Sequence, residues 1–263
     1  MSVDPRAATG FSAAADAYDL GRPSYPREAL ALLARELGLN AASTVLDLAA
    51  GTGKLTRGLM PFTGRVVAVD ASEGMLGMLR KRVPAADARV GTADAIPLAD
   101  GSVDAVVVGE AFHWFGTEDA CREIARVLRL GGGLALLWNR ARPAGAQQPW
   151  QPALEALSRP FREAAGSFPA EGERWKRAIH RTGLFRPLEE AEVEHTHETS
   201  PDALVALVAS WSWIANLVPD ERDALLANVR DLVADQPRLS LCYRTELYWT
   251  RRISPPGGSR SSS

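Results

Sequence analysis

Two aspartates, Asp47 and Asp70, each stand at or near the end of a short apolar run in the first third of the chain. Small residues follow the first aspartate at alternate positions, namely Ala49, Gly51 and Gly53. Such a loop lets a ligand come close to the backbone, because glycine has no Cβ. A carboxylate at the end of the next strand can accept hydrogen bonds from both hydroxyls of a ribose. The pattern indicates a nucleoside site.

The spacing in this loop decides which nucleotide fits. A P-loop, G-x-x-x-x-G-K-[ST], would need glycine at Leu48 and a hydroxyl residue at Leu55, so that motif is excluded. The dinucleotide fingerprint G-x-G-x-x-G matches only in part, since Gly51 and Gly53 are followed by Thr56 at the third position. A carboxylate beside this loop would also repel a pyrophosphate. S-adenosylmethionine fits better, because it has no phosphate and carries an ammonium and a sulfonium.

Alternating strands and helices must position these residues. Apolar runs predict strands at 44–48, 65–70, 88–90, 103–109 and 134–138. Ser72 and Thr117 are expected to cap helices, and Gly131–Gly133 to end the second of these helices. The alternation is typical of a parallel sheet with helices on both faces, which binds ligands at the carboxyl ends of its strands. Further on, we expect helices at 171–181, 201–211 and 220–233, and strands at 190–198 and 239–249.

Composition limits the class of protein. The formal net charge of -2 gives no basic surface for nucleic acid, and two cysteines make a disulfide framework improbable. The longest apolar runs are far shorter than the roughly 20 residues that span a bilayer, and the chain start lacks the pattern of a secretory signal. We therefore expect a cytoplasmic protein with a small-molecule partner, no nucleic acid and no membrane. The sequence leaves the oligomeric state open.

The length of 263 residues and a hydrophobic content of 46% allow a substantial core. We expect one domain over 1–251, with a core at about 40–140, an N-terminal helical segment at 11–38 and lid helices at about 200–235. The tail 252–263 is rich in Arg, Pro, Gly and Ser and is expected to be disordered.

Several motifs together resemble one known family, the class I S-adenosylmethionine-dependent methyltransferases, in the group that includes trans-aconitate methyltransferase-like enzymes with a methyltransferase type 11 domain. In chain order, "VLDLAAGTGKLT" is similar to motif I, "VVAVDASEGML" to motif II, "GTADAIPLADGSVDAVVVGEAFHWF" to the adenine loop and fourth strand, and "EIARVLRLGGGLALLWN" to the next helix and strand. The resemblance implies an α/β, Rossmann-like sheet of seven strands, six parallel and one antiparallel. It also implies a helical lid inserted between the last two strands.

The resemblance further implies a set of cofactor contacts. The methionine part would be surrounded by Asp47, Ala49, Gly51 and Gly53, the ribose by Asp70, the adenine by Ala71, Met75 and Ala93, and the sulfonium by Glu110 and Ala111. Near the N-terminus, Tyr18 and Arg22 would close over the cofactor and pair with its carboxylate. An alternative is that these two belong to a plain loop before a helix.

Two departures from the family pattern affect these contacts. Ala49 replaces the usual first glycine, which is a mild change if its φ is negative. Thr92 stands where an aspartate often binds the adenine amine, and Asp94 could supply that contact instead.

Methyl transfer from a sulfonium is an in-line displacement, so the enzyme must mainly align the acceptor and exclude water, and a general base is optional. His113, just past the fourth strand in "GEAFHWF", is the candidate catalytic residue, either deprotonating a hydroxyl or orienting the acceptor. Its alternative role is packing in the turn. The expected acceptor contacts are His113, Trp114, Trp138, Asn139 and Trp213.

A metal site is not expected. His195 and His197 share one strand face, but the sequence offers no third ligand for them. The predicted function is methyl transfer from S-adenosylmethionine to an oxygen or nitrogen of a small-molecule acceptor, with carboxylates among the candidates. The alternatives are a non-catalytic S-adenosylmethionine-binding protein on the same fold and an NAD-dependent oxidoreductase, which Asp47 opposes.

Overall fold

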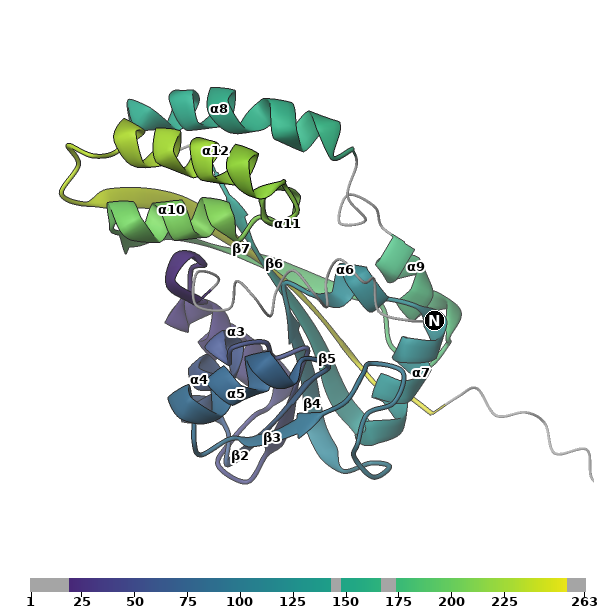
Figure 1. Ribbon diagram of the computed structural model, residues 1–263. Coiled ribbons are helices and arrows are strands. Elements are labelled where there is room, and N and C mark those ends of the chain that lie inside the picture. The colour runs from purple at the N-terminus through teal and green to yellow at the C-terminus, as the bar shows by residue number, and fades with distance from the viewer. Residues whose placement is uncertain (1–18, 143–147, 167–173, 255–263) are drawn as a thin grey trace, which may run out of the picture. The chain divides into compact units, whose positions relative to one another are not determined.

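The computed structural model describes residues 19–142, 148–166 and 174–254 (Figure 1). These residues fall into two compact units. The core unit holds residues 25–138, 174–193 and 246–254, and the helical unit holds the remainder. Three strands contribute residues to both units, so the expectation of a single domain stays a prediction.

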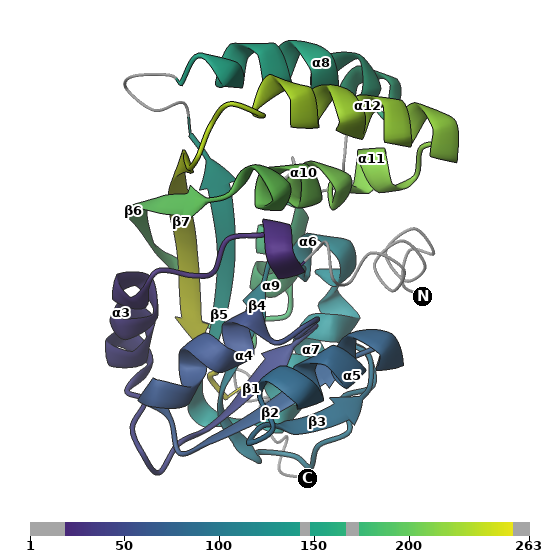
Figure 2. The same cartoon turned by 60° about the vertical axis from the view of Figure 1, so that its left-hand side comes forward.

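One seven-stranded sheet runs through the described residues. Its strands are β1 (Thr44–Leu48), β2 (Arg65–Asp70), β3 (Asp87–Val90), β4 (Val103–Gly109), β5 (Leu128–Ala141), β6 (Glu189–Thr199) and β7 (Leu239–Arg251). Their spatial order is β3-β2-β1-β4-β5-β7-β6 (Figure 2). Strands β2 and β3 therefore extend the sheet on one side of β1, and β4 and β5 extend it on the other. Ligands of such sheets bind at this reversal point of the strand order.

The strand directions agree with the predicted class. The pairs from β3 to β5 are all parallel. Strand β7 is antiparallel to β5. The Gly131 N–H donates to the Arg252 carbonyl, and the Arg142 N–H donates to the Cys242 carbonyl, so the residue numbers rise along β5 as they fall along β7. Phe185, just before β6, forms an antiparallel bridge with Arg252 at the end of β7. Strand β6 therefore has the same direction as the other parallel strands. Six parallel strands and one antiparallel strand confirm the expected sheet.

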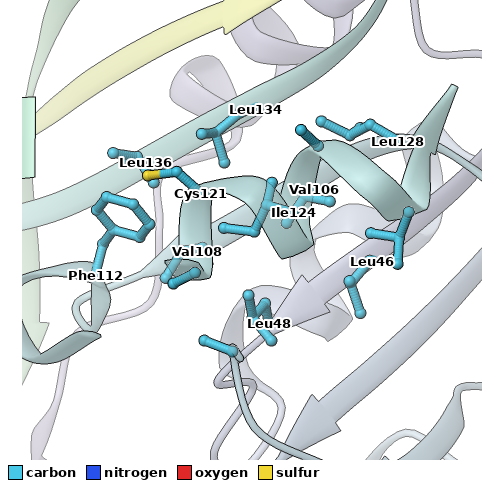
Figure 3. Packing of buried hydrophobic residues seen from close by; sticks show 14 of the residues in the cluster. Leu46, Leu48, Val106, Val108, Phe112, Cys121, Ile124, Leu128, Leu134 and Leu136 are labelled. Atoms are coloured by element: carbon cyan, nitrogen blue, oxygen red, sulfur yellow. The ribbon is translucent and has the colours of Figure 1, made fainter. Parts of the chain in front are cut away.

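Helices cover both faces of the sheet in the core unit. On one face lie α3 (Arg27–Leu37), α4 (Lys54–Leu59), the 3-10 turn η1 (Met60–Phe62) and α5 (Glu73–Arg82); on the other lie α6 (Phe112–Phe115), α7 (Glu118–Val127) and α9 (Arg174–Arg181). Successive residues of the strands alternate between these faces, so Val45 packs under α3 and Leu46 under α7. Figure 3 shows Cys121 and Ile124 of α7 among side chains of β4 and β5.

Local signals begin two of the helices where they were expected to. The Ser72 hydroxyl accepts a hydrogen bond from the Met75 N–H at the start of α5, and the Thr117 hydroxyl accepts one from the Ala120 N–H at the start of α7. Both predicted caps are confirmed.

The predicted role of Gly131–Gly133 was wrong. Helix α7 ends at Val127, and the three glycines lie inside β5, which begins at Leu128. The pairing of β4 with β5 shifts register between Val103 and Ala105, and Gly131 takes a left-handed φ of 76° at this bulge. A turn-like sequence thus serves an irregular strand.

Four helices form most of the helical unit: α8 (Trp150–Ala164), α10 (Pro201–Ala209), α11 (Ser212–Ala215) and α12 (Pro219–Leu232). Helix α12 packs between α8 and α10, as Figure 1 shows. Helices α10 to α12 lie between β6 and β7 in the chain, as predicted for the insertion.

Helix α8 was not predicted, and its range includes prolines at 152 and 160. Its apolar residues Trp150, Leu154, Leu157 and Phe161 nevertheless follow helical spacing, and all four pack in the apolar cluster of this unit.

The predicted tail, 252–263, begins one residue too early. Arg252 still belongs to the strand ladder, because its N–H donates to the Gly132 carbonyl. The rest of the predicted tail, from 255 on, lies outside the described residues.

Candidate cofactor and acceptor site

Asp47 lies at the carboxyl end of β1 with only 1% of its surface exposed. Its Oδ2 atom accepts a hydrogen bond of 2.6 Å from the Thr56 hydroxyl, and its Oδ1 atom has no hydrogen-bond partner among the described residues. Burial raises the pKa of Asp47 to about 7, against the lowering effect of the Thr56 hydrogen bond, and the nearby charge of Asp70 adds to the rise. The β1 end therefore holds a buried carboxylate oxygen that lacks a donor in the described part of the chain.

The loop after β1 uses three residues in the left-handed region. The φ angles of Ala49, Gly51 and Gly53 are 59°, 57° and 86°. The expectation of a mild change at Ala49 required a negative φ and is wrong, since an L-residue with a Cβ is strained there by about 1–2 kcal/mol. Gly53 is doubly constrained, because a Cβ on it would lie 2.8 Å from the Leu79 side chain.

Asp70 ties this loop to the end of β2. Its Oδ2 atom accepts the Gly51 N–H at 2.9 Å, and its Oδ1 atom accepts the Ser72 N–H at 2.8 Å. Burial raises the pKa of Asp70, and these two hydrogen bonds oppose the rise. A carboxylate oxygen has a second lone pair, so each oxygen can also accept a hydroxyl. Among its neighbours in motif II, Ala71 is exposed and Met75 is 4% exposed in the first turn of α5.

Thr92 and Asp94 act as one group in the turn after β3. The Thr92 hydroxyl donates a hydrogen bond of 2.6 Å to Asp94 Oδ1. This hydrogen bond lowers the pKa of Asp94, so the carboxylate stays ionised at neutral pH. Ala93, between them, is 8% exposed. Thr92 and Asp94, the two candidates for an adenine contact, are thus joined by a hydrogen bond in which the threonine supports the carboxylate.

The residue that follows β4, Glu110, is also strained. Glu110 has a φ of 59°, and its N–H donates to the Leu137 carbonyl of β5 at 2.8 Å. Ala111 follows as the N-terminal cap of α6, the turn that carries His113 and Trp114. Strained backbone that is held in place by its surroundings is common at functional sites.

A hydrogen bond links His113 to the core. The indole N–H of Trp138 donates to His113 Nδ1 at 3.2 Å. The Trp138 side chain is 2% exposed, and its ring centroid lies 5.1 Å from that of Trp175. Trp114 is half-buried, with its ring 4.9 Å from the His113 ring. Trp138 is thus part of the core and supports His113 from behind.

Two residues beside these groups were not among the predicted site residues. Thr56 is fully buried and pairs with Asp47; the signal was a threonine at the third position of the glycine fingerprint. Tyr25 packs against the apolar cluster under α3, and its hydroxyl lies against the end of β4, 2.3 Å from where a Cβ on Gly109 would be. No local pattern reveals that contact, because the two residues are far apart in sequence.

The remaining predicted residues belong to the helical unit. Arg22 Nε donates to the Ser210 hydroxyl at 3.0 Å, Asn139 Oδ1 accepts the Thr245 hydroxyl at 2.6 Å, and the Trp213 ring stacks on Trp211 at 4.9 Å. Tyr18 lies outside the described residues. The cofactor and acceptor roles of these residues stay predictions.

Neither a metal cluster nor a membrane helix is found in the described part of the chain. Within it, no three His, Cys, Asp or Glu side chains gather as a metal site would require, and the His195 ring stacks on Tyr243 at 5.7 Å. None of its helices has the length and apolarity needed to cross a bilayer.

These features define a class of protein: a doubly wound α/β protein with carboxylates at the ends of two neighbouring strands, beside the reversal point of its sheet. Comparison with known proteins agrees. Residues 46–136 match the model of a methyltransferase domain. An uncharacterized methyltransferase from Mycobacterium tuberculosis is 40% identical over 231 residues, 88% of each chain. The chain belongs to the methyltransferase family and is an S-adenosylmethionine-dependent methyltransferase.

Two further matches are informative. A malonyl-[acyl-carrier protein] O-methyltransferase from Methylococcus capsulatus is 46% identical over 134 residues, 48% of each chain. The solved structure of a candidate type II methyltransferase from Anaeromyxobacter dehalogenans has the same fold, with a TM-score of 0.64, 24% identity and coverage of 89% of this chain and 99% of that one.

The donor set of the core unit suits this cofactor. The unpartnered Oδ1 atom of Asp47 can accept a hydrogen bond from an ammonium group, which would also offset the buried negative charge. The Asp70 oxygens have lone pairs for two ribose hydroxyls. The residues present therefore fit S-adenosyl-L-methionine.

Replacing Ala49 with glycine should stabilise the protein. Relief of the left-handed strain outweighs the extra freedom of the unfolded chain, so we expect the free energy of unfolding to rise by about 1 kcal/mol. Urea unfolding of the ligand-free protein measures this. Ala50→Gly is the matched control, because Ala50 has no positive φ and is 8% exposed, and it should lose about as much. A loss of stability in Ala49→Gly would contradict the assignment of strain.

Asp47 should make the ligand-free protein less stable as the pH rises. The folded protein keeps the proton on this carboxyl up to about pH 7, whereas its ordinary pKa is 3.8. Folding therefore binds a proton between these values, and the free energy of unfolding should fall by about 3 kcal/mol from pH 4 to pH 7.

Urea unfolding across this range should show a much weaker fall in Asp47→Asn than in the wild type. Asp223→Asn, at a carboxylate whose side chain is 70% exposed, serves as the control and should follow the wild type. Parallel curves for the wild type and Asp47→Asn would mean that Asp47 is ionised in the folded protein.

Proposed function

We propose that this protein transfers the methyl group of S-adenosylmethionine to an oxygen or nitrogen of a small-molecule acceptor by in-line displacement, and that the acceptor is a carboxylic acid. The observation that carries the proposal is the pair of carboxylates at the ends of β1 and β2, one with an unpartnered buried oxygen. When bound, the cofactor supplies a methyl group on a positively charged sulfur. The protein must supply binding, alignment and a dry site.

The side chains of the core unit have distinct roles in this proposal. Asp47 takes the ammonium, Asp70 takes the ribose, and the Thr92–Asp94 pair takes the adenine amine. Ala49, Gly51 and Gly53 let the methionine part approach the backbone, Ala71, Met75 and Ala93 border the adenine, and Glu110 and Ala111 lie near the sulfonium. Arg22, and Tyr18 outside the described residues, stay the predicted partners of the cofactor carboxylate.

Two observations support a carboxylate acceptor. The Methylococcus capsulatus relative is named as an O-methyltransferase acting on a malonyl group, and a malonyl group carries a free carboxylate. The motif series also resembles the trans-aconitate methyltransferase-like group. Trp114, Asn139 and Trp213 remain candidates for shaping the acceptor site, together with His113.

Cofactor binding is the first test. Calorimetric titration with S-adenosylhomocysteine should give micromolar affinity, and NAD should not bind. Affinity should increase from pH 6 to pH 8, because Asp47 must lose its proton to pair with the ammonium. Asp47→Asn should bind more weakly and lose this pH dependence, and Asp70→Ala should also bind more weakly. Binding of NAD alone, or unchanged affinity in both variants, would contradict the site.

The acceptor is the second test. A panel of mono- and dicarboxylic acids, amines and alcohols is incubated with the protein and S-adenosylmethionine that carries a labelled methyl group. We expect label in methyl esters that mild alkali releases as methanol. Alkali-stable products would point to an amine or alcohol instead. Tight binding of S-adenosylhomocysteine with no product from any acceptor would favour the non-catalytic alternative.

A further inference from the structure

Trp138 fixes the protonation pattern of His113. An indole N–H can only donate, so His113 Nδ1, which lies 3.2 Å from Trp138 Nε1, must present a lone pair. The neutral imidazole then carries its single proton on Nε2. The opposite ring orientation would place a carbon against this indole N–H and remove its hydrogen bond.

The indole cannot easily turn away from the histidine. Its ring centroid lies 5.1 Å from that of Trp175 and 5.8 Å from that of Tyr248, and the two neighbours lie 5.2 Å from each other. Lys176 places its ammonium 4.8 Å from the Tyr248 ring centre and closes the cluster. The donor is therefore held by the core, and the histidine ring on α6 is oriented by it.

We infer that Trp138 is a positioning residue that holds His113 as a hydrogen-bond donor, and that His113 Nε2–H binds an oxygen of the acceptor instead of removing a proton from it. A neutral ring with its only lone pair engaged by an indole cannot act as a general base through Nε2. The acceptor part of this inference rests on the proposed function. The tautomer part rests on the hydrogen bond alone.

This arrangement suits an acceptor that needs no base. A carboxylic acid is already ionised at neutral pH, since its ordinary pKa is near 4. In its methylation an oxygen lone pair forms the new O–C bond, the C–S bond breaks with its electron pair remaining on sulfur, and no proton moves. A donor on one carboxylate oxygen would orient the other toward the methyl group.

Nitrogen NMR of the histidine rings tests the tautomer without any assay of activity. The chain has four histidines, so spectra of the ¹⁵N-labelled wild type and His113→Gln assign the His113 signals by difference. We expect a pyrrole-like Nε2, a pyridine-like Nδ1, and a scalar coupling across the hydrogen bond between Trp138 Nε1 and His113 Nδ1.

Trp138→Phe keeps an aromatic ring but removes the N–H, and it should shift both His113 nitrogens toward the values of a tautomer mixture. Trp175→Phe changes the same cluster without touching this hydrogen bond, and it should leave the His113 signals unchanged. A proton on Nδ1 in the wild type, or equal effects of both variants, would overturn the inference.

Kinetics with the best carboxylic acid acceptor distinguish a donor from a base. The amide of His113→Gln can donate an N–H from about the same position as Nε2 but cannot take up a proton. It should keep kcat/KM within roughly tenfold, whereas His113→Ala should lose roughly a hundredfold. Trp138→Phe should lower kcat/KM roughly tenfold, and Trp175→Phe should change it little.

The pH profile completes the test. The logarithm of kcat should stay level from pH 6 to pH 9 in wild type and His113→Gln, because no ionisation of His113 enters the reaction. An equal, large loss in His113→Gln and His113→Ala, together with an acidic limb, would identify a general base. If no acid accepts a methyl group, the acceptor part fails, and the NMR result still decides the tautomer.

Discussion

A carboxylate held out of water at the end of β1 is the constraint on which the cofactor site depends. Asp47 is buried among apolar strands, and one of its oxygens is satisfied only by Thr56. A second carboxylate, on Asp70, is close enough to raise the pKa of Asp47 further. A buried acid beside a half-buried one is unfavourable unless it is protonated or meets a cation. The two carboxylates thus favour a positively charged nucleoside beside them.

Backbone strain is concentrated at the same edge of the sheet. Ala49 follows β1 and Glu110 follows β4, and both have a φ of 59° although neither is glycine. Asp47 pairs with Val107 across these two strands, so the two strained residues flank the reversal point of the sheet. Fully buried strands on both sides hold the loops in place, which lets the chain keep conformations that an isolated loop would leave.

The aromatic cluster links core packing to chemistry. Trp138, Trp175 and Tyr248 come from β5, α9 and β7, and their mutual packing fixes the direction of one indole N–H. His113 therefore receives its tautomer and ring orientation from residues of the core cluster. A substitution of such a core residue keeps its effect on His113 only if the new side chain keeps the N–H donor. A phenyl ring of similar shape would lose the hydrogen bond.

Local sequence was sufficient for most of the architecture. Alternating apolar runs, the caps at Ser72 and Thr117, and the order of the motifs identified the parallel sheet, its class and the two acidic strand ends, because these signals involve residues at most a few positions apart. Local signals of this kind also assigned the glycines of β5 to a helix end and missed α8. In β5 the pairing with β4 overrides turn-forming residues. In α8 the packing against α12 overrides helix-breaking residues.

The roles of single side chains depended on the tertiary structure. The sequence by itself determined that carboxylates, small residues and a histidine stand at the ends of strands. Only the fold decided that Ala49 is left-handed, that Thr56 reaches Asp47, that Thr92 supports Asp94 and that Trp138 donates to His113. The physical reason is that strain, burial and hydrogen-bond direction are set by neighbours brought together by folding, and residue spacing along the chain does not encode them.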